Sequence, residues 1–358
     1  MNRYLFTALS LINFFIAQGA AYAQEWVTQE ACDISAIQTD DPEFQKALSQ
    51  TLTRTSTDGL INAVGKLWEV RHNDEKVSYL WGSLHSSEAL YIDQAEVLIP
   101  IMQEVEAAFF EHTFHGMRRK DLIKFNNRSI WNNVLTASHW LQKLHPDIKK
   151  AVVERFMYWG IDQQRLTYLQ ATAAVDYLLA SPCEDFNRGT YPIQDNYIQM
   201  LADHQNLEIL GLEEPGALHK RNYGFWNNKT AISIFSMLGA SLVDPELDSR
   251  DIAIAGRVYG DLYRRGEIGL MMQWSQEQVT EVLGEEEGAH HLEVADNYLL
   301  NERNRNWLKR LLPALNQQSN LIVVGAFHLP GKTGLIELLR REGMTVNRII
   351  LTDEAASH

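Results

Sequence analysis

Apolar residues fall into short runs along this chain, and polar segments separate the runs. Residues 67–71 and 77–81 are two such runs, and the polar segment His-Asn-Asp-Glu-Lys lies between them, which is typical of a β-hairpin. Each of the later runs is short enough for a single strand. They predict further strands at residues 107–111, 207–213, 321–324 and 345–351.

Longer stretches with helical spacing of apolar residues lie between these strands. They predict helices at residues 94–106, 251–265, 292–312 and 334–342. Pro313 is expected to end the third of these helices, and Gly343 the fourth. Residues 118–205 are also mainly helical in pattern and form an insert in the middle of the chain.

The order of strands and helices predicts the fold class. Strands separated by helices favour a parallel sheet with helices packed around it, and the early hairpin adds an antiparallel element. We therefore predict an α/β (α+β) fold with a mixed, mostly parallel central sheet flanked by helices. The two ends of the chain form this sheet, and the helical insert lies between them.

Composition separates the N-terminal part of the chain from this domain. Residues 1–23 carry one basic residue, a largely apolar stretch and the sequence Ala21-Tyr22-Ala23, which is typical of a cleaved signal peptide. The alternative, a membrane anchor, needs a longer apolar run. Residues 24–60 are polar and mixed, so we expect a loosely packed lead-in before the domain at residues 61–358. We therefore expect an exported protein, periplasmic or secreted, without a stable membrane span.

Charge and cysteine content narrow the choice of partners and compartment. The formal net charge is −14, and a chain this acidic is a poor binder of nucleic acid and of anionic membranes. The chain has two cysteines, Cys32 and Cys183. In an oxidising compartment this pair predicts one disulfide, and the alternative is two unpaired thiols.

Two of the predicted strands stop on the same motif, Gly-x-x-His. The second hairpin strand continues into Gly82-Ser-Leu-His85, and the run at residues 321–324 continues into Gly325-Ala-Phe-His328. With 21 Gly and 12 His in the chain, chance predicts ~0.7 matches to this motif. The chain holds two further matches, but these do not follow a predicted strand. Strand context therefore singles out Gly82 and Gly325, because a glycine at a strand end lets another group approach closely.

Carboxylates follow two other predicted strands, at Glu111 and Glu213. Because the carboxyl ends of parallel strands meet at one edge of a sheet, we expect both glutamates to gather there with His85 and His328. Two neutral imidazoles and one or two carboxylates suit a divalent metal ion such as Mn²⁺, Co²⁺ or Zn²⁺. An open position on the metal would lower the pKa of bound water to about 7. In the alternative interpretation the histidines cap the strands and the glutamates are solvated.

Other polar residues are weaker candidates. Arg303 lies near the start of a predicted helix, followed by Asn304, and its guanidinium is suited to clamp a carboxylate or to stabilise an oxyanion. The alternative for Arg303 is a solvated surface side chain. His112 and His115 are possible ligands, but we interpret both as polar loop residues.

The blocks that contain these residues resemble the TraB/PrgY/GumN family, which includes the Tiki proteases. The resemblance is carried by Asn-Glu-Arg-Asn-Arg-Asn-Trp at 301–307, by Val-Val-Gly-Ala-Phe-His-Leu-Pro-Gly at 323–331 and by Leu-Trp-Gly-Ser-Leu-His-Ser at 80–86. It extends over about residues 65–351. Ser83 and Ser86 depart from the pattern, since relatives often have Thr and Val there.

The resemblance implies a divalent-metal hydrolase, most simply a peptidase acting on a peptide or small-molecule substrate. We expect His85, His328 and Glu111 to bind the metal, and Glu111, Glu213 and Arg303 to act in catalysis. Gly82, Gly325 and Asn304 are the expected supporting residues. The wider fold is similar to that of erythromycin esterase and of the haem-binding ChaN proteins. A non-enzymatic protein that binds haem or another ligand in the same cleft, and a regulatory interaction protein, therefore remain as alternatives.

Overall fold

The structure is a computed structural model, and it describes the larger part of the chain. The described residues are 34–72, 76–86, 88–113, 140–158, 161–167, 193–213, 228–240 and 249–355. The predicted signal peptide, Cys32 and Cys183 lie outside these ranges, so export and the disulfide stay predictions. Among the described helices, none combines the length and the hydropathy that a membrane crossing requires.

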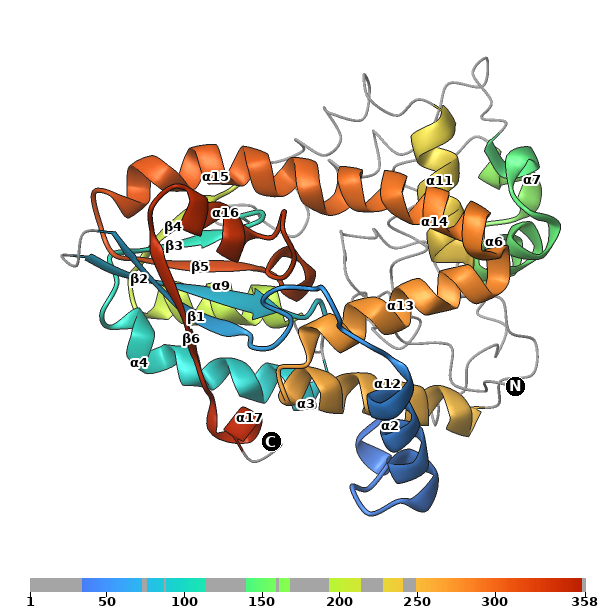
Figure 1. The fold of residues 1–358 in the computed structure, drawn as a ribbon, viewed down its shortest axis with the longest axis horizontal. Coiled ribbons are helices and arrows are strands. Elements are labelled where there is room, and N and C mark those ends of the chain that lie inside the picture. Colours follow the sequence, from blue (N-terminus) through green and yellow to red (C-terminus); the bar gives the residue numbers. More distant parts are fainter. Residues whose placement is uncertain are drawn as a thin grey trace.

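A six-stranded sheet forms the centre of the fold, in the order β4-β3-β5-β2-β1-β6 (Figure 1). Strands β2, β5, β3 and β4 are parallel neighbours, whereas β1 is antiparallel to both β2 and β6. The mixed, mostly parallel sheet predicted from the sequence is therefore confirmed. The strands are β1 (Leu67–His72), β2 (Lys76–Ser83), β3 (Ala107–Phe110), β4 (Glu208–Gly211), β5 (Asn320–Gly325) and β6 (Thr345–Ile349).

Helices cover both faces of this sheet because successive strand residues point to opposite sides. On β5, Ile322 and Val324 pack in a cluster with helices α15 (Glu302–Leu315) and α16 (Leu335–Arg341). Leu321 and Val323 pack on the other face, in a cluster with α4 (Leu98–Met102) and α9 (Gln194–His204). The strand is therefore buried on both sides, as its uninterrupted apolar run indicates.

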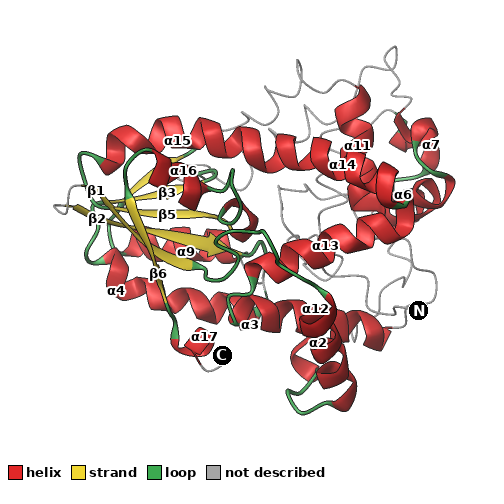
Figure 2. Ribbon diagram, in the orientation of Figure 1, coloured by secondary structure: helices red, strands yellow, loops and turns green. Residues whose placement is uncertain are grey.

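A helical region lies beside the sheet (Figure 2). One apolar cluster joins α6 (Pro146–Tyr158), α7 (Gln163–Leu166), α11 (Asn228–Ala240) and parts of α13 (Ile268–Leu283) and α14 (Glu285–Asp296). A second cluster joins α12 (Ser249–Arg264) to α2 (Pro42–Arg54), α13 and the turns after β2 and β5. The short elements are η1 (Ile34–Ala36), α3 (Ala89–Ile92), η2 (Asp93–Val97), η4 (Trp140–Lys143), η6 (Ala326–His328) and α17 (Thr352–Ala355).

One long helical run connects the two regions and corrects a prediction. Helix α14, the π-helical segment η5 (Asn297–Asn301) and α15 follow one another without a break. Pro313 does not end the helix, which continues to Leu315. Pro313 is exposed and lies in the last turn of α15. Proline has no backbone N–H, so one hydrogen bond of this turn is missing, but at an exposed position water can bind the carbonyl oxygen instead. Leu311 and Leu315 pack in the core and hold this last turn in place.

Two further expectations were wrong. The segment at 94–106 is not one helix but the end of the 3₁₀-helix η2 followed by the short helix α4, which ends at Met102. The lead-in at 24–60 does not pack loosely in its described part, because Phe44, Ala47 and Leu48 of α2 are buried against α12. Their spacing of three and four residues gives α2 one apolar face, and Asp41 caps its first turn by accepting from the N–H groups of Glu43 and Phe44. Helices α11 and α13 were not predicted from the sequence.

Candidate functional site

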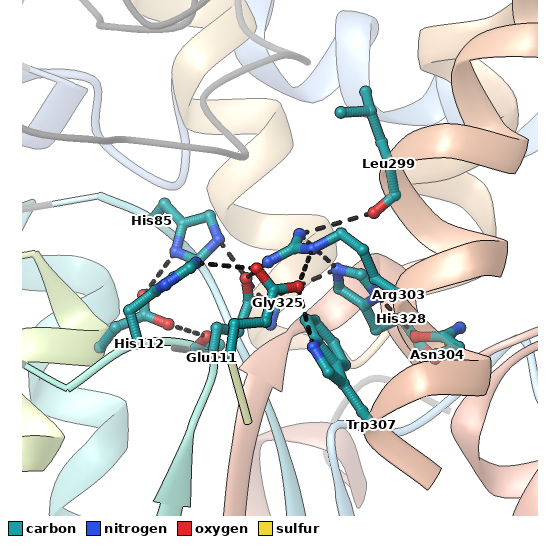
Figure 3. Close-up of polar contacts among 12 residues, drawn as sticks. His85, Glu111, His112, Leu299, Arg303, Asn304, Trp307, Gly325 and His328 are labelled. Atoms are coloured by element: carbon teal, nitrogen blue, oxygen red, sulfur yellow. Dashed lines mark hydrogen bonds and ion pairs between the residues drawn. The ribbon is translucent and has the colours of Figure 1, made fainter. Parts of the chain in front are cut away.

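The four parallel strands end at the same edge of the sheet, and the chain after each strand supplies one side chain to a buried cluster (Figure 3). His85 follows β2, His328 follows β5, Glu111 follows β3 and Glu213 follows β4. All four side chains are at least nine-tenths buried. The structure thus brings together the four residues whose gathering the sequence predicted.

Glu111 lies at the centre of the cluster. Its Oε1 accepts a hydrogen bond of 2.7 Å from the backbone N–H of Gly325. The same oxygen is 3.9 Å from His85 Nε2 and 3.7 Å from His328 Nε2. One carboxylate oxygen is therefore faced by one nitrogen of each imidazole.

Arg303 joins the two glutamates. Its Nη2 donates to Glu111 Oε2 at 2.6 Å, and its Nε donates to Glu213 Oε1 at 2.7 Å. Arg303 is 2% exposed, so the interpretation as a solvated surface residue was wrong. Burial alone would raise the pKa values of both carboxyls, but the guanidinium holds the pKa of Glu111 and of Glu213 below the ordinary value. Both glutamates are therefore ionised at neutral pH.

The π-helical segment ends two residues before Arg303, and such local departures from α-helical geometry are frequent at functional sites. Arg303 Nη1 donates back to the carbonyl oxygen of Leu299 at 3.5 Å. Trp307, one turn further along α15, packs its ring 4.5 Å from the guanidinium carbon and donates from Nε1 to Glu213 Oε1 at 2.9 Å. The helix therefore fixes both the guanidinium and the carboxylate that it contacts.

Asn304 orients His328. The Nδ1 atom of His328 lies 2.6 Å from Asn304 Oδ1, while Asn304 Nδ2 donates to the carbonyl oxygens of His328 and Thr333. Because Nδ2 serves these carbonyls, Oδ1 is the acceptor, and the proton of the imidazole is assigned to Nδ1. Nε2 then presents a lone pair, which faces Arg303 Nη1 at 3.3 Å. Burial, helped by Arg303, lowers the pKa of His328 to about 3, so this imidazole is neutral.

Asp195 of α9 holds His85 in the corresponding way. Its Oδ2 is 2.7 Å from His85 Nδ1, so that Nε2 of His85 points to Glu111. Burial alone would lower the pKa of His85, but the negative charges of Asp195 and Glu111 raise it to about 9. Without a metal, His85 is therefore protonated at neutral pH, and a cation that binds to Nε2 has to displace a proton.

His112 corrects another expectation. It lies in the loop after β3, as expected, but it is not an exposed polar residue: it is buried beside Glu213, with its Nε2 at 3.5 Å from Glu213 Oε2. Burial lowers the pKa of His112 to about 4, so this imidazole is neutral. The backbone carbonyl of His112 accepts a hydrogen bond of 3.3 Å from Gln199 of α9. His115 lies outside the described residues.

The glycines of the two Gly-x-x-His motifs, Gly82 and Gly325, lie next to different groups. A Cβ at Gly325 would lie 3.2 Å from Glu111 Oε1, 3.2 Å from His85 Nε2 and 3.6 Å from His328 Cδ2. A Cβ at Gly82 would instead lie 2.7 Å from Leu329 Cδ1, away from these polar groups. Gly325 therefore leaves open the space between the three polar side chains, whereas Gly82 lets two elements of the core pack closely.

The donor set fits a divalent metal in chemistry. Nε2 of each histidine faces Glu111 Oε1, and Nδ1 of each histidine is anchored on an oxygen acceptor, which is the usual surrounding of a metal-binding imidazole. The cluster contains three carboxylates, of Glu111, Glu213 and Asp195, but only one guanidinium, that of Arg303. With neutral histidines the cluster therefore carries two more negative charges than positive ones, which a divalent cation would balance. As the side chains stand, no three His, Cys, Asp or Glu residues in the described ranges are arranged to hold a metal ion.

The sequence of this chain matches the model of the TraB/PrgY/gumN family over residues 66–348, which is most of its length. The chain belongs to the TraB/PrgY/gumN family. The match begins just before β1 and ends in β6, so it contains the sheet except for Ile349 and every site residue described above. No curated protein and no solved structure matches the chain significantly.

Sequence reasoning missed the roles of four residues at this TraB/PrgY/gumN site, Gln194, Asp195, Trp307 and His112. Asp195 and Gln194 lie in the helical middle of the chain, far in sequence from the strand that they contact, and no motif marks them. Trp307 was part of the family-like block but had no assigned role. His112 follows Glu111 directly, and since the strand before it is short and buried, its position next to a candidate ligand was the available signal. The catalytic and metal-binding roles expected of His85, Glu111, Glu213, Arg303 and His328 stay predictions.

Proposed function

We propose that this TraB/PrgY/gumN protein is a divalent-metal-dependent hydrolase, with peptides as the first substrate class to test. His85, His328 and Glu111 would hold the ion. The observation that carries the proposal is that Nε2 of both histidines faces one oxygen of Glu111 while their Nδ1 atoms are anchored elsewhere. Imidazole and carboxylate ligands suit Zn²⁺, Mn²⁺ and Co²⁺.

The remaining charged residues support hydrolysis. When bound, the metal would supply a water of lowered pKa and a Lewis acid for a carbonyl oxygen. Glu213 offers Oε2 as a proton acceptor, since its Oε1 already accepts hydrogen bonds from Arg303 and Trp307. His112 Nε2, 3.5 Å from that oxygen, provides a second neutral base. Arg303 keeps both glutamates ionised and places positive charge where negative charge develops on the substrate.

The surroundings of the imidazoles favour this function over haem binding. An axial haem ligand needs an apolar slot beside its free nitrogen. His85 Nε2 and His328 Nε2 face a carboxylate instead, and His328 Nε2 also faces the guanidinium of Arg303.

Metal binding and hydrolysis are tested together on the full chain purified without chelator. We expect about one equivalent of Mn²⁺, Co²⁺ or Zn²⁺ per chain by elemental analysis, and cleavage in a peptide library that EDTA stops and the metal restores. His85→Ala and His328→Ala should each lose the metal and the cleavage while keeping the circular dichroism of the wild type, because a site histidine contributes little to the core.

His291→Ala is the matched control for these variants. His291 is as buried as His85, but it hydrogen-bonds Ser233 in the helical region, so its replacement should leave metal content unchanged. Normal metal content in both His85→Ala and His328→Ala would overturn the metal site. A metal-loaded wild type that cleaves no member of the library would overturn the assignment as a peptidase.

We also propose that the protein is exported and carries a Cys32–Cys183 disulfide, on the basis of residues 1–23 and the even cysteine count. Protein isolated from its host should begin at Gln24 in N-terminal sequencing. Peptide mapping without reductant should recover Cys32 and Cys183 in one linked fragment. An intact Met1 on the soluble protein would contradict export, and two freely alkylated thiols would contradict the disulfide.

A further inference from the structure

We propose that Asp195 is a positioning residue, which acts through His85 by fixing the ring so that Nε2 faces the site and by strengthening Nε2 as a metal donor. The inference rests on the proposed metal site, but its structural half is testable without metal. Asp195 lies in the first turn of α9, 110 residues from His85 in sequence. The sequence patterns gave no reason to connect the two.

Both carboxylate oxygens of Asp195 bind side chains of the Gly-x-x-His turn that follows β2. Oδ2 lies 2.7 Å from His85 Nδ1, and Oδ1 accepts a hydrogen bond of 2.6 Å from the hydroxyl of Ser83. A carboxylate accepts hydrogen bonds but donates none, so Nδ1 has to carry the proton of this contact. That assignment leaves Nε2, which faces Glu111, as the nitrogen available to a metal.

The preceding residue, Gln194, holds the same turn through the backbone. Its side-chain Oε1 accepts from the N–H of Leu84 at 2.9 Å, and its own N–H donates to the carbonyl oxygen of Ser86 at 2.9 Å. The Gln194 side chain is fully buried and also accepts from the hydroxyl of Tyr263 at 2.8 Å. Two consecutive residues of α9 therefore bind four consecutive residues of the turn, from Ser83 to Ser86.

Helix α9 is a firm support for this contact. Ile198 and Ala202, on the face one and two turns after Gln194, are fully buried in the cluster that covers one side of the sheet. Asp195 is therefore held by the same packing that holds β2 and β5. Precise orientation of a ligand requires a support of this kind, because small displacements weaken metal binding.

The two histidines differ in their anchors, and the difference indicates what Asp195 adds. His328 Nδ1 is bound by the neutral amide of Asn304, and His85 Nδ1 by a negatively charged carboxylate. A carboxylate behind an imidazole increases the electron density on the far nitrogen and raises its basicity as a ligand. Asp195 thus makes His85 the stronger donor of the two and contributes a negative charge close to the ion.

The competing explanation is that Asp195 only stabilises the fold through a buried pair with His85. The two explanations are separated by comparing Asp195→Ala with Asp195→Asn. The asparagine side chain keeps an acceptor for Nδ1 and a group for the Ser83 hydroxyl, but it loses the charge. Asp203→Asn, which removes a carboxylate from the exposed end of the same helix, is the control.

The experiment uses the full chain and two measurements. Calorimetric titration with Co²⁺ should show a 10–100-fold lower affinity for Asp195→Ala, a smaller loss for Asp195→Asn and no change for Asp203→Asn. NMR of the metal-free protein labelled with ¹⁵N-histidine should show a downfield, slowly exchanging Nδ1 proton of His85. This signal should remain in Asp195→Asn and disappear in Asp195→Ala.

Each result decides between the explanations. Unchanged Co²⁺ affinity in Asp195→Ala, with the melting temperature lowered, would show a purely structural role and overturn the proposal. A His85 Nδ1 proton that persists in Asp195→Ala would overturn the assigned contact. If the wild type binds no metal, the proposed function fails, and the NMR comparison alone then decides whether Asp195 orients His85.

Discussion

Replacing Arg303 with methionine is expected to lower the free energy of unfolding by about 3–5 kcal/mol, the usual cost of removing one partner from a buried ion pair. Methionine retains much of the side-chain volume but leaves Glu111 and Glu213 buried without the guanidinium that binds both of them. Arg303 is 2% exposed, so water cannot replace the lost hydrogen bonds. Urea denaturation of the variant and the wild type measures the difference.

Replacing Arg303 with lysine tests whether the positive charge alone is sufficient, because lysine keeps the charge but not the planar arrangement of donors. Nε and Nη2 of Arg303 reach two different carboxylates at 2.7 and 2.6 Å, whereas a lysine has one nitrogen and cannot occupy both positions. We expect Arg303→Lys to lose less stability than Arg303→Met, about 1–3 kcal/mol for the unsatisfied acceptor. We expect turnover to fall about 100-fold, as on loss of one electrostatic donor.

Arg305→Lys provides the control for both variants. Arg305 lies on the same helix but is exposed, so its replacement should change the free energy of unfolding by less than about 0.5 kcal/mol. If Arg303→Lys keeps full turnover and the stability of the wild type, the bridging role of the guanidinium is wrong.

The strands and the edge at which they end could be predicted from the sequence for a simple reason. In a parallel sheet, each central strand is apolar on both faces, so it appears as an uninterrupted run that stops where polar residues begin. The chain after β2, β3, β4 and β5 leaves the sheet at one edge, and the four residues that stand there are His85, Glu111, Glu213 and His328. Local pattern and topology were sufficient to bring them together.

The residues that orient those side chains could not be predicted in the same way. Asp195 contacts His85 because α9 packs against β3 and β4, which brings its first turn to the turn after β2, and this packing depends on the tertiary structure and not on a local pattern. The contact of Trp307 with Glu213 depends on the rotation of α15 about its axis, which the π-helical segment before Arg303 shifts. A sequence pattern with a period of 3.6 residues does not reveal such a segment.

The same distinction explains the errors in the helices. We expected Pro313 to end the helix because proline disfavours helix interiors. The packing of Leu311 and Leu315 in the core instead keeps α15 helical beyond Pro313. The lead-in was considered too polar to pack, but α2 needs only one apolar face, which Phe44, Ala47 and Leu48 provide. In both cases a few buried apolar contacts decide the structure, although the local sequence, a proline or a mostly polar composition, favours another outcome.

Gly325→Ala and Gly82→Ala are expected to have opposite effects on the site and on the fold, although both change the glycine of a Gly-x-x-His motif. The backbone at Gly325 has φ −52° and ψ 137°, which alanine adopts without strain. Its new methyl group would occupy the space 3.2 Å from both Glu111 Oε1 and His85 Nε2. We therefore expect a nearly unchanged melting temperature but about 100-fold lower turnover, the loss typical of a 1 Å displacement at a reacting centre.

A methyl group at Gly82 meets the core instead. It would lie 2.7 Å from Leu329 Cδ1 and 3.0 Å from the Cα atom of Ala326, and the backbone of the η6 turn cannot move as a flexible side chain can. We expect a loss of about 1–3 kcal/mol in the free energy of unfolding, as for other overpacked core positions. At a temperature where this variant is folded, its Co²⁺ affinity should fall less than that of Gly325→Ala. Thermal melts and Co²⁺ titrations of the two variants side by side give the comparison. The opposite order, with metal affinity retained in Gly325→Ala and lost in folded Gly82→Ala, would mean that the ion does not bind between Glu111, His85 and His328, because the methyl group at position 325 fills that space.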